Sequence, residues 1–338
     1  YSLNEHRDDF AMERFSIERD RHYLIPYIRE ALALRPDLKL FASPWSPPTW
    51  LKFPSVYNYG TLVWKPEYLE AYALYFLKFV RAYREEGIEI NQVHVQNEPA
   101  ADQKFPSCVW TGAQLSEFIA RYLGPLFERE GEPCEVWLGT LNMDDFDGYP
   151  NTVLSNPEAA RYISGVGVQW FAKRCLQRLA MSWPGFRLIQ TENECGNGQN
   201  AWDFAHYVFN LIWQYITNGV SADVYWNMVL QPGGSSTWGW TQNSMVTVDP
   251  ASGSVTYNPE FYVMKHFSRF VEPGAARLVT AGPWTGNAVA FRNPGGSTVV
   301  VAANHFAEER ELAISTPEGS LSATLPARSF NTLVFPEG

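Results

Sequence analysis

The sequence has few residues of the kinds that bind metals or form disulfide scaffolds. Its 4 cysteines are scattered singly, without a Cys-x-x-Cys pair, and they are too few to predict a disulfide framework, although one or two bridges remain open. Its 6 histidines include no His-Glu-x-x-His run. We therefore expect neither a catalytic metal held by the protein nor another cofactor.

Basic residues and long apolar runs are also scarce. The chain has 26 Lys and Arg against 36 Asp and Glu, a net charge of −10, which argues against a nucleic-acid partner. No apolar run approaches the roughly 20 residues of a membrane span, so we expect no integral membrane segment. The chain opens at Tyr1 without an apolar leader, which predicts a processed or truncated N-terminus.

Aromatic residues are abundant instead. There are 13 Trp, 17 Tyr and 21 Phe among 338 residues. Some of these rings must fill a hydrophobic core. So many tryptophans are also typical of surfaces that stack flat, weakly polar ligands such as sugar rings. Composition alone leaves both interpretations open.

Short apolar segments alternate with longer amphipathic ones over most of the chain. Six segments are predicted strands: 38–43, 92–96, 135–140, 165–170, 186–191 and 223–229. Five are predicted helices: 20–34, 68–86, 114–130, 202–218 and 258–270. This alternation predicts an α/β fold with a parallel sheet.

The pattern changes near residue 273. The predicted strands 276–280, 288–292, 298–303, 311–315 and 330–335 follow one another without a helix between them. We therefore predict two domains, an α/β domain over 1–272 and a small C-terminal β-sandwich part over 273–338.

Two glutamates follow apolar strands directly. Glu98 stands in Gln-Asn-Glu-Pro at 96–99, and Glu192 ends Ile-Gln-Thr-Glu at 189–192. They are 94 residues apart, or three strand–helix units of about 31 residues, as in a (β/α)8 TIM-type barrel. The active site of such a barrel lies at the carboxyl ends of its strands. Six predicted strands correspond to about six of the eight units.

A pair of carboxyl groups is the minimum equipment for glycoside hydrolysis. One is protonated and gives its proton to the leaving oxygen, while the other is ionised and attacks the anomeric carbon or activates water. Glu194 is an alternative to Glu192, because both have the same strand parity. A single strand-end glutamate is otherwise more often part of a surface salt bridge or a helix cap.

At these residues the sequence resembles glycoside hydrolase family 30, the family of acid β-glucosylceramidase and its bacterial relatives. The most specific match is Ser-Pro-Trp-Ser-Pro-Pro-Thr-Trp-Leu-Lys at 43–52. Further matches lie at 96–99, 165–171, 189–192, 225–230 and 266–270. The agreement extends from about residue 10 to the C-terminus.

The resemblance implies a role for each matching residue. Glu98 would be the general acid/base and Glu192 the nucleophile of a retaining reaction, with carboxyl groups roughly 5–5.5 Å apart. Asn97 would bind the sugar 2-hydroxyl. The remaining substrate-binding candidates are aromatic or amide side chains near strand ends: Trp45, Trp170, Trp226 and Asn227. Trp238, in a Gly- and Trp-rich loop, is a candidate for stacking on the aglycone or the next sugar, or for packing within its own loop.

The sequence departs from the family pattern in two ways. Gln169 and Phe171 replace the His and Tyr that flank the residue matching Trp170 in glucosylceramidases, which removes one partner for the nucleophile carboxylate. Family members also have two βα units and a sugar-binding Asp before the segment that matches Tyr1, so we expect the first two units to be missing.

The sequence therefore predicts a retaining β-glycosidase acting on β-glucosides, either a glucosylceramide-like glycolipid or an oligo-glucoside. The alternatives within the family are a β-1,6-glucanase and a β-xylosidase or β-fucosidase. The alternative from another class is a non-catalytic carbohydrate-binding fragment. The family also implies a secreted or periplasmic location.

Overall fold

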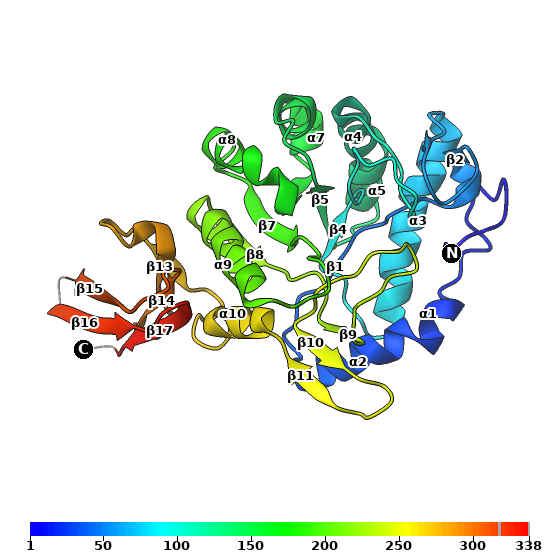
Figure 1. The fold of residues 1–338 in the computed structure, drawn as a ribbon. Helices are drawn as coiled ribbons and strands as arrows, with labels where there is room; N and C mark the ends of the chain where they lie inside the picture. The colour runs from blue at the N-terminus through cyan, green and yellow to red at the C-terminus, as the bar shows by residue number, and fades with distance from the viewer. Residues whose placement is uncertain (317–318, 337–338) are drawn as a thin grey trace. The chain divides into compact units, whose positions relative to one another are not determined.

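A computed structural model describes residues 1–316 and 319–336 of the chain. The chain divides into two compact units, Tyr1–Thr191 and Glu192–Gly338. Each unit is described by itself below (Figure 1).

The first unit is built on a sheet whose neighbouring strands follow one another in the sequence. The strand order is β1-β4-β5-β6-β7, and the pairs β1–β4, β4–β5 and β5–β6 are parallel. The strand bounds are β1 Phe41–Ala42, β4 Gln92–His94, β5 Glu135–Leu141, β6 Ile163–Gln169 and β7 Arg187–Glu192, with a separate hairpin of β2 Lys52–Phe53 and β3 Thr61–Leu62. The prediction of a parallel α/β sheet is confirmed.

Helices α3, α4, α5, α7 and α8 each come after a strand and lie along one side of this sheet, whereas α1 and α2 precede β1 (Figure 1). Their bounds are α1 Glu18–His22, α2 Leu24–Leu34, α3 Pro66–Glu85, α4 Gly112–Phe118, α5 Gly124–Arg129, α6 Thr152–Leu154, α7 Pro157–Ala160 and α8 Leu176–Ser182. Helix α3 shows why they pack there. It begins at Pro66, and its buried residues include Leu69, Tyr72, Phe76 and Val80, spaced by three or four positions, which gives one apolar stripe.

Two predicted helices are interrupted in the structure. The segment predicted at 114–130 forms α4, a π-helical turn Ile119–Leu123 and α5. The interruption precedes Pro125, which cannot donate a backbone hydrogen bond. The segment predicted at 20–34 is divided at Tyr23, whose φ of −134° is not helical. Pro26 then lies in the first turn of α2, where proline is tolerated.

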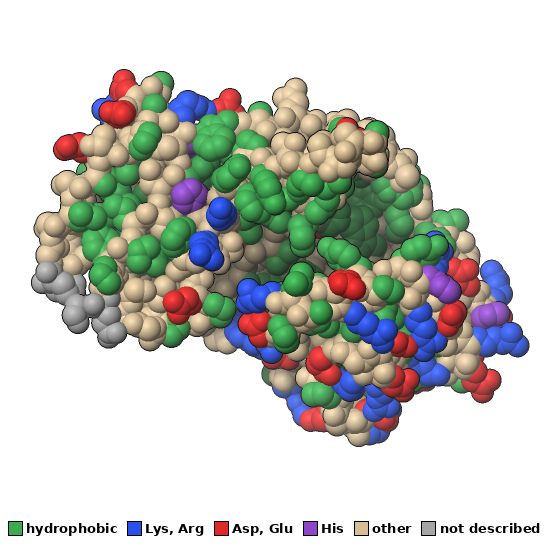
Figure 2. All heavy atoms as spheres, turned by 90° about the horizontal axis from the view of Figure 1, so that it is seen from below, with side chains coloured by type: hydrophobic (Ala, Val, Ile, Leu, Met, Phe, Trp, Pro, Cys, Tyr) green, Lys and Arg blue, Asp and Glu red, His purple; other side chains and the backbone are tan. Residues whose placement is uncertain are grey.

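Lys and Arg side chains lie among Asp and Glu side chains on the face drawn in Figure 2. Arg21 and Arg29 both bind Glu86, each at 2.7 Å. The side chain of Glu132 is 1% exposed and pairs with Arg84. Opposite charges therefore neutralise one another locally, and these contacts form no basic face.

The second unit begins with α9 (Trp202–Thr217) and β8 (Val220–Asp223), followed by a small sheet of β9 (Val229–Leu230), β10 (Val246–Val248) and β11 (Val255–Tyr257). All six strands predicted for the barrel therefore form, but the one predicted at 223–229 is displaced toward the N-terminus. Its strand ends at Asp223, and the backbone N–H of Trp226 donates to the side chain of Asn193 at 2.7 Å rather than to a strand.

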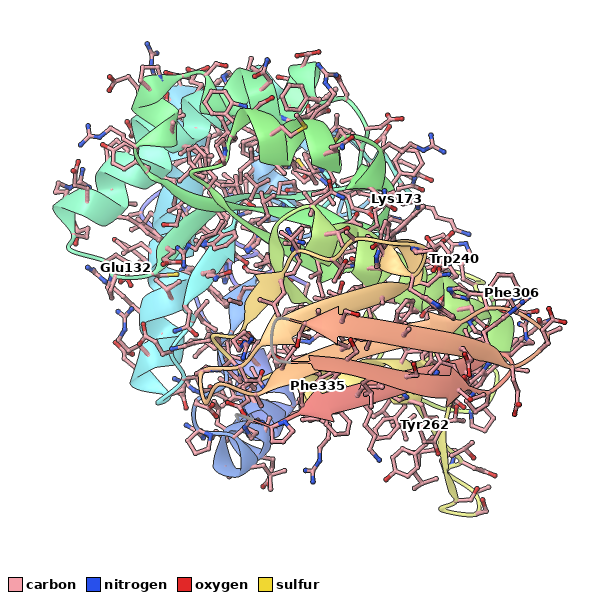
Figure 3. The ribbon with its side chains drawn as sticks, turned by 90° about the vertical axis from the view of Figure 1, so that its left-hand side faces the viewer. Glu132, Lys173, Trp240, Tyr262, Phe306 and Phe335 are labelled. Carbon is pink, nitrogen blue, oxygen red and sulfur yellow. The ribbon has the colours of Figure 1, made fainter. Side chains whose placement is uncertain are left out.

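The C-terminal part is a sandwich of two antiparallel layers (Figure 3). After α10 (Pro259–Ser268), one layer has the order β12-β13-β14-β17 and the other is the pair β15–β16. The strands are β12 Ala276–Leu278, β13 Ala288–Arg292, β14 Thr298–Asn304, β15 Arg310–Thr316, β16 Gly319–Leu325 and β17 Ser329–Phe335. The predicted sandwich is confirmed. Strand β16 was not predicted, although Leu321, Ala323 and Leu325 alternate with polar residues; its residues are small and mostly exposed.

Strand β14 shows how the sandwich is held. Val299 and Val301 pack with residues of α9 and α10, whereas Val300 and Ala302 pack with Leu312 of the facing layer. Successive side chains of a strand point to opposite faces, so one strand serves two cores.

The structure also describes the cysteines, the metal-ligating side chains and the apolar character of the helices. All four cysteines are free thiols. Among residues 1–316 and 319–336, no group of three metal-ligating side chains gathers. The described helices include none with the length and apolar character needed to cross a bilayer.

The core of the first sheet contains a histidine. His94 is fully buried, stacks on Trp137 with ring centroids 5.4 Å apart and contacts Phe41 at 4.9 Å. Burial lowers the pKa of His94 to about 3, so the imidazole is neutral near pH 7. A Cβ added to Gly167 of β6 would lie 2.3 Å from its Nδ1 atom, and this close approach requires glycine at position 167.

We predict that Gly167→Ala lowers the free energy of unfolding by about 1–3 kcal/mol, because an added methyl group overpacks this core. Gly185→Ala is the control, because nothing lies within 4 Å of a Cβ added there. Urea denaturation of both variants measures the difference. Equal stability of the two variants would contradict the packing described.

Candidate active site

The backbone of Glu98 is held at the carboxyl end of the first sheet. Beyond the last residue of β4, the N–H of Gln96 donates to the carbonyl of Gly139 at 2.9 Å, and the N–H of Glu98 donates to Thr140 at 2.9 Å. The parallel ladder with β5 thus continues up to Glu98. This places Glu98 where a parallel α/β fold puts its active site.

The side chain of Glu98 is in an environment that favours the protonated form. It is partly buried, and burial raises the pKa of its carboxyl group. Its Oε1 atom accepts a hydrogen bond from the amide of Asn142 at 2.8 Å, which opposes this rise. The residue has a φ of +47°, a left-handed conformation that is costly for a residue other than glycine and is found at functional sites.

Asn97 is buried beside Glu98 with its amide orientation fixed. Its Oδ1 atom accepts from the hydroxyl of Thr140 at 2.7 Å and from the Nε2 atom of Gln169 at 2.8 Å. Two donors saturate this oxygen, so the amide presents Nδ2 as the group that can donate to a ligand. The replacement of His by Gln at 169, noted in the sequence, therefore supplies a donor to Asn97.

Two of the predicted tryptophans, Trp45 and Trp170, lie close to Gln96 and to the end of β6. The carbonyl of Trp45 accepts from the side chain of Gln96 at 3.0 Å, and its ring contacts Phe105 edge-on at 5.2 Å. Trp170 directly follows β6, in a short 3-10 helix (Trp170–Arg174), with the Lys173 ammonium 5.1 Å from its ring centroid. Both rings are partly exposed, so part of each can contact a ligand.

Glu192 and Glu194 have different surroundings in the second unit. Glu192 is the last residue of β7. Glu194 accepts a hydrogen bond from the hydroxyl of Tyr207 in α9, and burial together with this carboxylate raises the pKa of Tyr207. Glu194 thus anchors the loop to a helix. The assignment of Glu192 rather than Glu194 as the reactive carboxylate stays a prediction.

Trp226 and Asn227 lie beyond the strand end at which they were predicted. The side chain of Asn193 holds the backbone of Trp226, as described above. The amide of Asn227 donates to the carbonyl of Asn243 at 3.1 Å. The carbonyl of Asn227 also accepts from the backbone N–H of Met245 at 3.0 Å. Contacts beyond β8 therefore hold both residues.

Trp238 lies in the loop between β9 and β10. It and Trp240 are 36% and 38% exposed, and the loop is closed by a 2.7 Å hydrogen bond from the Ser236 N–H to the Trp240 carbonyl. The two predicted roles of Trp238, stacking on a ligand or packing in its own loop, both stay predictions.

Sequence reasoning missed several polar residues of the site. Thr140 and Asn142 lie at the carboxyl end of β5, and the rule that selected Glu98 applies to them as well. The acidic segment 143–147 lies just beyond these residues. Two of its carboxylates form ion pairs, Asp144 with Arg174 and Asp147 with Arg178.

Comparison with known proteins shows a match over nearly the whole chain. Residues 1–271 match the glycosyl hydrolase family 30 TIM-barrel domain, and residues 274–333 match the family 30 β-sandwich domain. Lysosomal acid glucosylceramidase of Mus musculus is 31% identical, over 99% of this chain and 70% of its own length. An endo-1,6-β-D-glucanase of Aspergillus fumigatus is 26% identical, over 99% of this chain and 73% of its own.

Solved structures agree with the sequence matches. The crystal structure of SrfJ from Salmonella typhimurium superposes with a TM-score of 0.90 at 27% identity, covering 100% of this chain and 78% of that one. The endo-β1,6-glucanase BT3312 superposes with a TM-score of 0.89 at 22% identity, covering 100% and 79%. With both domain models matched in sequence order, the chain belongs to glycoside hydrolase family 30.

Proposed function

We propose that the chain hydrolyses β-glucosides with retention of anomeric configuration, with Glu98 as general acid/base and Glu192 as nucleophile. The observation that carries the proposal is the environment of Glu98, whose carboxyl pKa is raised by burial while Asn142 holds its side chain. A carboxyl group whose pKa is raised keeps its proton to a higher pH than an exposed glutamate does, which suits it to protonate a leaving group. The family's retaining mechanism supplies the nucleophile's role.

The reaction proceeds by two displacements. The carboxylate of Glu192 attacks the anomeric carbon, and the bond to the leaving oxygen breaks as Glu98 gives that oxygen its proton. Water then attacks the same carbon while the Glu98 carboxylate takes a proton from it, and the Glu192 carboxylate is released. Retention requires carboxyl groups about 5–5.5 Å apart, whereas a separation near 9 Å would argue for inversion.

The other predicted residues bind the sugar in this proposal. Asn97 presents Nδ2 to the 2-hydroxyl group, a contact that strengthens in the transition state. Trp45, Trp170 and Trp226 supply apolar surface for the ring. In this proposal the two carboxyl groups carry the proton transfers and the covalent step.

The names of the relatives support a β-glucoside as substrate. They are glucosylceramidases and endo-1,6-β-glucanases, and the glycosidic bond in question is a β-glucosidic one in both. A β-1,6-glucan is the second candidate, favoured by the exposed Trp238 and Trp240, which can stack on a further sugar. The neighbours described as xylanases have 20–22% identity, so they support the fold and not the substrate.

We predict that Glu192→Gln lowers kcat on a nitrophenyl β-glucoside by at least about 10³-fold, because the covalent step loses its nucleophile. Glu194→Gln is the matched control and should retain kcat within about tenfold, because that side chain holds Tyr207 rather than the substrate. Circular dichroism confirms that both variants fold. Loss of activity in Glu194→Gln alone would reverse the assignment, whereas sugar binding without turnover by the wild-type chain would favour a non-catalytic fragment.

The pH dependence tests the role of Glu98. The acid must be protonated, so kcat/KM falls as the pH rises through the pKa of Glu98. Because the Asn142 hydrogen bond lowers this pKa, Asn142→Ala should move the alkaline limb to higher pH. Asn151→Ala, which removes a similar amide contact 3.1 Å from the surface carboxylate Asp147, should leave the profile unchanged. A shift to lower pH in Asn142→Ala would count against Glu98 as the acid.

A further inference from the structure

The segment that follows Glu192 leaves the sheet in an irregular conformation. Gly196, Gly198 and Asn200 all have positive φ angles, of 71°, 81° and 48°. The segment therefore has no helical or strand hydrogen bonds of its own to hold it. Its backbone groups need partners from elsewhere in the chain.

One buried side chain supplies most of those partners. The Oδ1 atom of Asn243 accepts from the backbone N–H groups of Gly198 at 2.8 Å and of Asn197 and Asn200 at 3.3 Å. The backbone N–H of Asn243 donates to the carbonyl of Cys195 at 2.7 Å. A Cβ at Gly196 would lie 2.5 Å from the Asn243 amide carbon, so these two segments of the chain are in direct contact.

Glu260 fixes the amide of Asn243. The Nδ2 atom of Asn243 donates to Glu260 Oε1 at 2.7 Å, and both residues are fully buried. Glu260 lies in the first turn of α10, so a helix anchors the amide. The second carboxyl oxygen of Glu260 has no hydrogen-bond partner among the described residues. Asn243 and the backbone N–H of Glu260 itself both donate to this buried carboxyl side chain.

Asn243 also orients Asn227. The amide nitrogen of Asn227 donates to the Asn243 carbonyl at 3.1 Å and lies 3.5 Å from the side-chain oxygen of Gln242. With its nitrogen engaged, Asn227 presents Oδ1, an acceptor, to a ligand. The same residue therefore contacts the loop behind Glu192 and a predicted sugar-binding side chain.

We propose that Asn243 and Glu260 form a clamp in which Asn243 is a positioning residue held by Glu260. The clamp fixes residues 195–200, which follow Glu192, and orients Asn227 so that its amide oxygen can accept from a substrate hydroxyl group. The proposal rests on the proposed function, because it assigns how that site is kept in register. A displacement of about 1 Å at a reacting group costs about 10²-fold in rate. Loosening this clamp should therefore lower kcat without any loss of the catalytic carboxylates themselves.

The test compares Asn243→Ala with Asn304→Ala. Asn304 is an equally buried asparagine whose amide donates to three backbone carbonyls of the sandwich. Asn243→Ala should lower kcat on a nitrophenyl β-glucoside by about 10²-fold and speed amide hydrogen exchange in residues 195–200. Asn304→Ala should lower the melting temperature but leave kcat and that exchange unchanged.

A second pair of variants keeps the test decisive if Asn243→Ala does not fold. Glu260→Gln retains an oxygen that accepts from Asn243 and should keep near wild-type kcat, whereas Glu260→Leu should lower kcat and speed the same exchange. Equal loss of kcat in Asn243→Ala and Asn304→Ala, or in both Glu260 variants, would overturn the proposal, as would unchanged exchange. If the wild-type chain shows no turnover, the proposed function fails, and the exchange measurement still decides whether the clamp exists.

Discussion

The parallel pairing of β4 with β5 is the interaction on which the proposed acid half of the site depends. Because that pairing continues past the last residue of β4 to the N–H of Glu98, the chain enters its left-handed turn at a fixed point. Asn142 then meets the carboxyl group from the neighbouring strand end. Register, side-chain contact and raised pKa are consequences of one ladder, and a slip of one residue would face Glu98 the other way.

Two buried asparagines do similar work in the two units. Asn97 and Asn243 each use the amide oxygen to accept more than one hydrogen bond, and Asn243 uses its nitrogen as a donor. A neutral amide can satisfy several donors and acceptors without the desolvation cost of a buried charge.

Features that depend on local residue patterns and on strand ends could be predicted from the sequence. The strands, the sandwich and the position of Glu98 follow from apolar runs and from polar residues directly after them. The strand before Trp226 was displaced, because a side chain of Asn193 replaces a strand partner, which no local pattern reveals. Asn243 was missed for the same reason, since its partners lie about 45 residues earlier in the chain. Helix 114–130 was predicted as continuous although Pro125 marked its interruption.

The most direct measurement is to trap the covalent intermediate. A 2-deoxy-2-fluoro-β-glucosyl fluoride slows the release step, so the glycosyl group accumulates on the nucleophile and can be located by peptide mass spectrometry. The account predicts a single adduct on Glu192, with a normal rate of trapping in Glu194→Gln and none in Glu192→Gln. An adduct on Glu194, or turnover that inverts the anomeric configuration without an adduct, would contradict it.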